Sequence, residues 1–308
     1  MRRIGYRHQR TLGSPVEVRG VGFVTGAQVR VRFLPAPADT GVVFVRTDLP
    51  IRATIPALAD RVTGTKRRTT LGPTETGVTL VEHVLATLAG MRIDNCRIEI
   101  DGPEPPGLDG SALGFVEAIS GAGAELLPAR RTVWAATEPV VVTHDGATVG
   151  LHPPDPELTG LNLRVSYILD YGQNGPIPRQ AHTMTVSPEA FAREVAGCRT
   201  FLLEQEAAGL RAQGVGLHLT PADVLVFGAK GPIDNSLRYA DEPARHKVLD
   251  LIGDLSLCGF DVVGHVVAYR SGHSLNVALA NALAARAKLA DELMAPTRVL
   301  LPARRRAA

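Results

Sequence analysis

The chain contains 308 residues, 45% of them hydrophobic and 21% charged, with a formal net charge of +2 at pH 7. This composition predicts a soluble globular protein and excludes disordered and collagen-like chains. The small net charge argues against a basic face for nucleic acid, and no apolar run approaches the ~20 residues needed to span a bilayer. We therefore expect neither a nucleic-acid partner nor stable membrane insertion.

Cysteine usage and the N-terminus bear on the cell compartment. Cys96, Cys198 and Cys258 lie far apart with no Cys-x-x-Cys pair, so neither a disulfide framework nor a thiolate zinc site is expected. Reduced, buried thiols fit a reducing compartment. The basic N-terminal residues lack the apolar stretch of a signal peptide. These features predict a cytoplasmic protein, which we expect to be a monomer.

The first half of the chain reads as strands, then a helix, a strand and a second helix. Residues 11–60 alternate apolar and polar side chains and contain the β-rich run 42–45, with Gly and Pro turn signals between segments. A helix is predicted over 79–88, because Thr79 as N-cap and Glu82 three residues later have capping-box spacing. The remaining elements predicted here are a strand over 96–100 and a helix around 112–119.

The second half repeats this order after a candidate linker at 127–131. The elements predicted in it are strands at 140–142, 161–169 and 262–269 and helices at 188–196, 242–257 and 274–289.

The two halves also share a spacing. His83 and Ser111 are 28 residues apart, as are His246 and Ser274, and in each pair a strand lies between the two helices. We predict an α+β protein formed by internal duplication, with two similar two-layer α+β domains at residues 1–127 and 132–300, and a chance match of the two spacings is the alternative.

A stripe of polar residues runs along the predicted helix at 242–257. His246, Asp250 and Asp254 fall at i, i+4 and i+8, which places them on one face, and apolar residues fill the rest. Carboxylates in such a buried helix are costly unless a metal or a cation compensates them. The stripe therefore predicts a metal site, and a hydrogen-bonded core pair of His246 and Asp250 is the alternative.

A second acid–imidazole pair occurs at the matching place of the first half. If the halves pack pseudo-symmetrically, Glu82 and His83 face the stripe across the interdomain cleft. His83, His246 and Asp250 would then be the ligands of a catalytic zinc, which takes three protein ligands and lowers the pKa of water to about 7. Glu82 suits the general base, and a capping-box role is its alternative.

Three further positions complete the candidate site. His273 lies in a loop before a helix, where it is predicted to act as a general acid supported by the carboxylate of Asp254. Lys247 could neutralise an oxyanion or a substrate phosphate. Thr200 and Phe201 are read as the end of an apolar helix that lines either a substrate pocket or the core.

Ten segments spread over nearly the whole chain form one ordered pattern: 20–22, 35–41, 46–49, 81–83, 88–90, 93–95, 108–112, 199–201, 246–255 and 271–276. In their order and number these segments resemble a known family, the UDP-3-O-acyl-N-acetylglucosamine deacetylases of lipid A biosynthesis.

The resemblance implies a fold and a set of roles. It implies helices packed between the sheets of two α+β domains, with the active site in the cleft between the domains. It implies zinc on His83, His246 and Asp250, with Glu82 as base, His273 as acid and Asp254 as the support of the acid. Substrate contacts are implied for Thr200, Phe201, Lys247 and Arg270, and an acyl passage for an insertion around 201–217.

The chain departs from the family pattern in places. Residues 20–26 lack the usual histidine and carry Val24 in that loop, residues 171–176 also lack a common histidine, residues 214–220 bring in His218, and Arg270 replaces a usual lysine. These changes leave the chemistry in place and bear on the acyl length and the amine substrate.

We therefore expect zinc-dependent removal of the N-acetyl group from UDP-3-O-acyl-N-acetylglucosamine, with Fe²⁺ as the alternative metal to Zn²⁺. One rival is a paralogous deacetylase for another N-acetylated sugar. A second is a non-haem iron oxygenase, because two histidines and one carboxylate also form that triad. A third is a binding protein on the same scaffold, which competent residues at every expected position disfavour.

Overall fold

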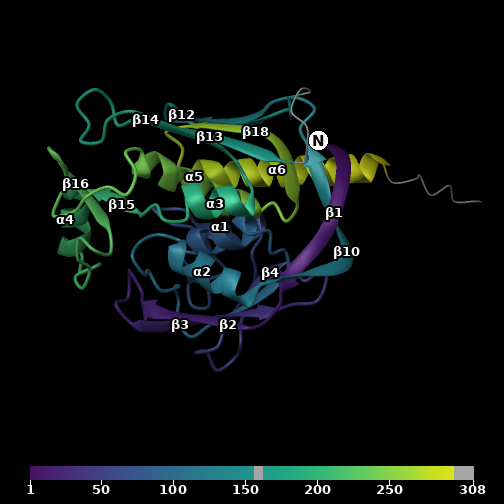
Figure 1. The fold of residues 1–308 in the computed structure, drawn as a ribbon, viewed down its shortest axis with the longest axis horizontal. Helices are drawn as coiled ribbons and strands as arrows, with labels where there is room; N and C mark the ends of the chain where they lie inside the picture. Colours follow the sequence, from purple (N-terminus) through teal and green to yellow (C-terminus); the bar gives the residue numbers. More distant parts are fainter. Residues whose placement is uncertain (156–161, 295–308) are drawn as a thin grey trace, which may run out of the picture.

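The computed structural model describes residues 1–155 and 162–294. Within these residues, two β-sheets enclose a middle layer of α-helices, as Figure 1 shows. The helices are α1 (Glu82–Gly90), α2 (Leu113–Ala122), α3 (Pro188–Glu194), α4 (Glu204–Ala212), α5 (Glu242–Ser256) and α6 (His273–Met294), and η1 (Ala59–Arg61) is a 3₁₀ turn. The predicted α+β class, with helices between sheets, is confirmed.

The first-half sheet has five strands. In spatial order they are β2 (Val16–Val21), β3 (Gln28–Pro35), β9 (Cys96–Ile100), β4 (Val42–Arg46) and β5 (Thr54–Pro56). β4 and β9 are parallel, and the other neighbours are antiparallel. Along β3, Val29, Val31 and Phe33 are buried while the residues between them are more exposed. This alternation turns one face of the sheet towards the helices, where the Phe33 ring packs edge-on against Phe115 of α2.

The second-half sheet has the same internal order. β11 (Val140–His144), β12 (Ala147–His152), β18 (Asp261–Tyr269), β13 (Leu163–Leu169) and β14 (Gln180–Thr185) follow one another, and β13 and β18 are the parallel pair. Position by position, the strands and their directions match those of the first sheet. This shared topology supports an internal duplication.

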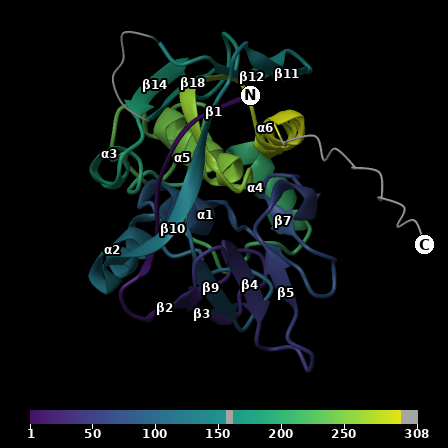
Figure 2. The ribbon, with the colours of Figure 1, turned by 90° about the vertical axis from the view of Figure 1, so that its right-hand side faces the viewer.

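Two long strands connect the halves. β1 (Arg2–Leu12) pairs with β10 (Ala124–Ala135), which pairs with β18, and both strands run along the side of the molecule that is at the right in Figure 1 and faces the viewer in Figure 2. The segment 127–131, predicted to be a linker, lies inside β10. Arg7 of β1 forms ion pairs with Asp94 of the first half and Asp261 of the second, so this side of the junction is fixed by charge as well as by the sheet.

The described residues also form two small three-stranded sheets. One contains β6 (Val62–Gly64), β7 (Thr70–Leu71) and β8 (Val78–Thr79), and the other contains β15 (Phe201–Leu203), β16 (Leu225–Gly228) and β17 (Gly231–Pro232). The sheet of β15, β16 and β17 projects with α4 at one end of the molecule (Figure 1). β15 and α4 lie within residues 201–217, where the resemblance implies an insertion, while β16 and β17 follow that segment.

Besides the linker, two local predictions were wrong. Thr79 belongs to β8 and α1 begins at Glu82, with Val81 as the N-cap residue, and among the described residues no side chain caps this helix. Thr79 and Glu82 therefore form no capping box. Thr200 and Phe201 do not end a helix, because α3 ends at Glu194 and Phe201 begins β15.

The close approach of α1 and α5 places the halves against each other. A Cβ atom on Gly253 of α5 would lie 2.2 Å from the Glu82 carbonyl oxygen of α1. Real side chains do not tolerate that distance, so glycine permits this crossing. Because Gly253 lies between Asp250 and Asp254, the tight crossing also brings the polar stripe of α5 to the first turn of α1.

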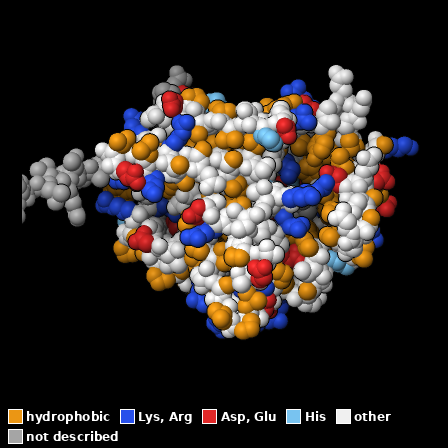
Figure 3. Space-filling model, turned by 180° about the vertical axis from the view of Figure 1, so that it is seen from behind, with side chains coloured by type: hydrophobic (Ala, Val, Ile, Leu, Met, Phe, Trp, Pro, Cys, Tyr) orange, Lys and Arg blue, Asp and Glu red, His pale blue; other side chains and the backbone are white. Residues whose placement is uncertain are grey.

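The surface is mixed in character. On the face seen in Figure 3, Lys and Arg side chains alternate with Asp and Glu side chains, as expected for a net charge of +2. Over residues 1–155 and 162–294, no helix has the length and apolar character to cross a membrane.

Candidate metal centre and catalytic site

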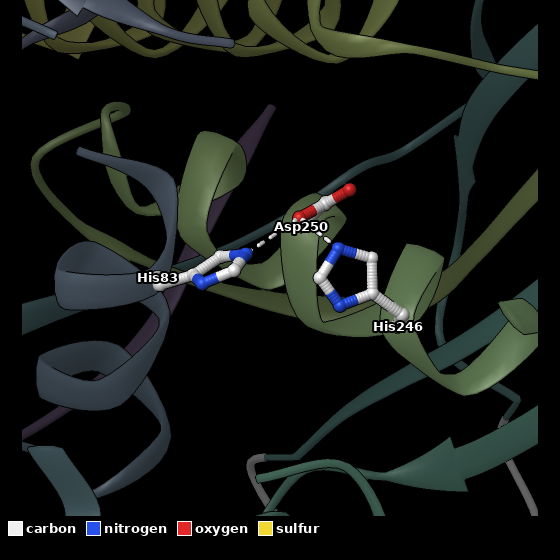
Figure 4. A group of neighbouring side chains, drawn as sticks. All are labelled: His83, His246 and Asp250. Carbon is white, nitrogen blue, oxygen red and sulfur yellow. Dashed lines mark ion pairs between the residues drawn. The ribbon is translucent and has the colours of Figure 1, made fainter. Parts of the chain in front are cut away.

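Three side chains from the two halves converge where α1 meets α5. His83 Nε2 lies 3.6 Å and His246 Nε2 lies 3.3 Å from the same oxygen, Oδ1 of Asp250. The two imidazole rings are 5.0 Å apart and meet nearly edge-to-face. Figure 4 shows both rings directed at the Asp250 carboxylate. The three ligand atoms lie within 4.8 Å of one another, an arrangement that could hold one metal ion.

The donor atoms have the properties that a divalent cation requires. Within residues 1–155 and 162–294, Asp250 Oδ1 is a buried acceptor without a hydrogen-bond partner. Burial lowers the pKa of His246 to about 4, so its imidazole is neutral and able to ligate. The backbone carbonyl of Cys198, 3.0 Å from His246 Nδ1, leaves Nε2 free towards Asp250. A metal ion would satisfy the unpaired oxygen, so the residues fit the expected group.

The second oxygen of Asp250 is held by a cation. Lys247 Nζ donates to Oδ2 at 2.9 Å, and the Lys247 side chain is 23% exposed. Burial opposes ionisation of Asp250, but His246 and Lys247 outweigh it and hold its pKa well below the usual range. Burial also opposes the charge of Lys247, and the neighbouring Asp250 more than offsets it, so the lysine pKa is raised. The carboxylate is therefore ionised and oriented.

Glu82 lies beside the proposed ligands at the start of α1. Its side chain is buried, and Oε2 accepts a hydrogen bond from the Thr69 backbone N–H at 3.0 Å. Burial raises its pKa, against the opposing effects of His273 and His83. A carboxylate whose pKa is moved towards neutrality is suited to accept a proton from water.

His273, at the start of α6, is paired with a buried carboxylate. Its Nδ1 lies 2.9 Å from Asp254 Oδ2, and its Nε2 lies 3.9 Å from Glu82 Oε1. Burial favours the neutral ring, but Asp254 and then Glu82 outweigh it and raise the pKa of His273 to about 9. Asn276 also donates to Asp254 Oδ2, at 2.9 Å. Asp254 therefore contacts the ring of His273, and its role as the support of an acid stays a prediction.

A cavity of about 370 Å³ opens onto these groups. Lys247 lies at its wall, with Nζ 5.5 Å from the centre of the Phe201 ring. Asp254 and Arg270 are not among the described residues that line the cavity. The candidate site residues at its wall are Glu82, His83, Thr200, Phe201, His246, Lys247, Asp250 and His273.

The two main departures from the family pattern meet beside this cavity. His218 Nε2 lies 2.9 Å from the Gly22 carbonyl oxygen, and Phe23 of the same loop lines the cavity. The loop that lacks the usual histidine therefore contacts a histidine supplied by the second half.

Sequence reasoning missed two residues of the site. Thr69 contacts Glu82, Asp254 and His273, and Asn276 holds Asp254. Thr69 lies in a short hairpin with no periodic pattern. Asn276 follows His273 by three residues at the start of a helix, and that i, i+3 spacing was the available signal.

Comparison with known proteins agrees with the geometry. The profile of the UDP-3-O-acyl N-acetylglycosamine deacetylase (LpxC) family matches residues 9–285. The UDP-3-O-acyl-N-acetylglucosamine deacetylase of Nostoc sp. is 40% identical over 282 residues, which cover 90% of this chain and 98% of that protein. The protein of the same name from Anaeromyxobacter dehalogenans is 40% identical over 275 residues, 88% of this chain and 86% of that one.

A fused relative extends the comparison. The bifunctional enzyme LpxC/FabZ of Chlorobaculum tepidum is 37% identical over 302 residues, which cover 88% of this chain and 62% of that protein. The family profile spans every residue of the candidate site, and the relatives cover most of the chain. The chain therefore belongs to the UDP-3-O-acyl N-acetylglycosamine deacetylase (LpxC) family.

Proposed function

We propose that this protein hydrolyses the N-acetyl group of UDP-3-O-acyl-N-acetylglucosamine and releases acetate, as a zinc-dependent step of lipid A biosynthesis. The names of its relatives support the substrate. The observation that carries the chemistry is the convergence of His83 from one half with His246 and Asp250 from the other, beside Glu82 and His273. Ligands, base and acid thus lie around one cavity.

The proposed ligands are His83, His246 and Asp250. Two imidazoles and one carboxylate leave a coordination position open, as in catalytic zinc sites. When bound, a divalent metal supplies Lewis acidity that polarises the amide carbonyl and lowers the pKa of water. Zn²⁺ is the proposed ion, with Fe²⁺ as the alternative.

Glu82 and His273 have complementary proton roles in this proposal. Glu82 accepts a proton from the water that attacks the acetyl carbon. His273, whose pKa is raised to about 9, is protonated at neutral pH and donates to the amine nitrogen as the C–N bond breaks. The acetyl group leaves as acetate and the amine leaves with the proton from His273. The 3.9 Å between Glu82 Oε1 and His273 Nε2 keeps both groups within reach of one amide.

The cavity wall suits an amphipathic substrate. Phe201 and Phe23 supply apolar surface, while Lys247 supplies a cation beside the reacting centre. Lys247 is proposed to stabilise the negative charge of the carbonyl oxygen or a phosphate, and Thr200 to contact the sugar. Arg270 lies on the exposed turn before α6, so its proposed contact is with a part of the substrate that extends out of the cavity.

The domain limits remain part of this proposal. We assign residues 1–127 and 132–300 to two duplicated domains with the site between them, and 295–300 lie outside the described residues. The shared topology of the two sheets and the origin of the ligands in both halves support this assignment. We also propose that the protein acts as a cytoplasmic monomer.

Mass spectrometry of reaction products tests the function directly. Incubation with UDP-3-O-acyl-N-acetylglucosamine should yield a product that has lost one acetyl group, together with free acetate. The contact between His218 and Gly22 favours examining a second candidate, a paralogous deacetylase for another N-acetylated sugar. Cleavage of a non-acylated N-acetyl sugar alone would support that candidate, whereas oxygen uptake without acetate release would point to an oxygenase.

A further inference from the structure

Thr69 is a buried residue that contacts several of the groups proposed to move protons. It is fully buried and lies immediately before β7, in the three-stranded sheet of β6, β7 and β8. It does not belong to the described residues that line the cavity. Any effect of Thr69 on the reaction would therefore pass through its neighbours.

The backbone N–H of Thr69 orients the proposed base. It donates to Oε2 of Glu82 at 3.0 Å, and the second oxygen, Oε1, is the one that lies 3.9 Å from His273 Nε2. A hydrogen bond to a buried carboxylate is charge-assisted and directional. It therefore selects which oxygen of Glu82 is turned towards the acid.

The hydroxyl of Thr69 orients the support of the proposed acid. Oγ1 donates to Asp254 Oδ1 at 2.6 Å, while Asp254 Oδ2 accepts from His273 and Asn276 at 2.9 Å each. A hydroxyl has a single proton. Because that proton goes to Asp254, Thr69 Oγ1 acts as an acceptor towards His273 Nδ1, which lies 3.3 Å away. The Nδ1–H of His273 is then shared between Asp254 Oδ2 and Thr69 Oγ1. Both contacts keep the ring proton on Nδ1 and direct Nε2 towards Glu82.

The position of Thr69 is itself fixed by its surroundings. Its carbonyl oxygen accepts from the Val81 N–H at 3.4 Å, directly before α1. The hydroxyls of Thr70 and Thr79 lie 2.7 Å apart and hold β7 to β8. Thr69 thus belongs to the first half, like Glu82, while Asp254 and His273 belong to the second.

We propose that Thr69 is a positioning residue that sets the geometry between base and acid, with its N–H holding Glu82 and its hydroxyl holding the Asp254–His273 pair. This role rests on the proposed function. Thr69 thereby connects a base of the first half with an acid of the second half.

The substitution Thr69→Val tests the hydroxyl while retaining the shape and the backbone N–H. A hydrogen bond to a buried charged group corresponds to roughly 10- to 100-fold in rate, so kcat should fall by about that factor. KM should stay unchanged because Thr69 lines no part of the cavity. Thr69→Ser, which keeps the hydroxyl, should recover most of kcat. Metal content and the melting temperature of both variants serve as controls for folding.

A double-mutant cycle separates positioning from a general structural role. In a His273→Ala background, Thr69→Val should reduce kcat by less than about 3-fold, because the group through which the hydroxyl acts is gone. An equal loss in both backgrounds would overturn the proposal, and so would a Thr69→Val enzyme with the wild-type kcat.

A spectroscopic readout keeps the inference testable without turnover. The Nδ1–H proton of His273 should give a downfield NMR resonance that shifts or broadens in Thr69→Val and persists in Thr69→Ser. An unchanged resonance in Thr69→Val would refute the positioning role. If the wild-type protein releases no acetate, the proposed function fails, and this resonance still decides whether Thr69 positions His273.

Discussion

The two helices that meet at the site contribute in different ways. α5 carries His246, Asp250 and Asp254 on one buried face, and its own geometry sets the distances among them. α1 is shorter and offers its groups from its first turn, where their placement depends on packing against α5. The residues of α5 are therefore positioned by the geometry of a single helix, whereas those of α1 are positioned by the contact between α1 and α5.

This difference predicts which changes remove the site and which only displace it. Changes to the ligands of α5 should abolish metal binding, because no packing adjustment can restore a missing donor. Changes at the α1–α5 contact should weaken the metal site in proportion to the displacement of α1.

The largest effect is expected from the ligands of α5. His246→Ala or Asp250→Ala should lose tightly bound zinc and nearly all activity, with the fold retained because most of the core of both halves is distant. Elemental analysis and a turnover assay measure this. His144→Ala, which removes an exposed imidazole that does not line the cavity, is the matched control. Full zinc occupancy in both ligand variants would show that the assignment is wrong.

The next effect concerns the base on α1. Glu82→Gln should retain the metal while kcat falls by roughly 10²- to 10⁴-fold, the usual scale for a lost general acid–base group. Steady-state kinetics with parallel metal analysis would detect it. A variant with the wild-type kcat would leave Glu82 as a structural residue only.

The packing of α1 on α5 can be tested without touching a functional side chain. Gly253→Ala places a methyl group 2.2 Å from the Glu82 carbonyl oxygen, which should destabilise the protein by about 1–3 kcal/mol and weaken metal binding. Gly121→Ala is the matched control, since a Cβ there meets no described atom within 4 Å. Equal stability and metal affinity in the two variants would contradict the account of the crossing.

Some parts of the site could be predicted from the sequence and others could not. The α5 stripe was predictable because its spacing is local and periodic. The pairing of His83 with that stripe needed the matching spacing of the two halves. Thr69 escaped prediction because its partners Asp254 and His273 are distant in sequence and its hairpin has no periodic pattern.

The fold divides in a similar way. The helix at 242–257 was predicted to within a residue of α5, because its apolar pattern is long and regular. The segment 127–131 resembled a linker, yet it is a strand because β1 pairs with it from far away in the chain. The capping-box spacing of Thr79 and Glu82 was misleading. Thr79 is part of strand β8, and the Glu82 carboxylate accepts a hydrogen bond from the Thr69 backbone N–H instead of from the start of the helix.

The smallest expected effect is a shift of a pH profile. The pKa of His273, raised to about 9, lies above its ordinary value of about 6.5, so protonated His273 and its contribution to stability are lost as pH rises through 9. The alkaline limb of kcat/KM should fall in that range, and Asp254→Asn should move it to lower pH. A limb that stays at the wild-type pH in Asp254→Asn would refute the His273–Asp254 pairing.

The central claim is that one metal ion is held jointly by both halves of the chain. Elemental analysis of zinc in the wild-type protein and in His83→Ala, after dialysis against a weak chelator, tests this most directly. The account predicts about one zinc per wild-type chain and a large loss in His83→Ala, although all residues of α5 are intact. Undiminished zinc in His83→Ala would contradict it, because α5 alone would then hold the metal.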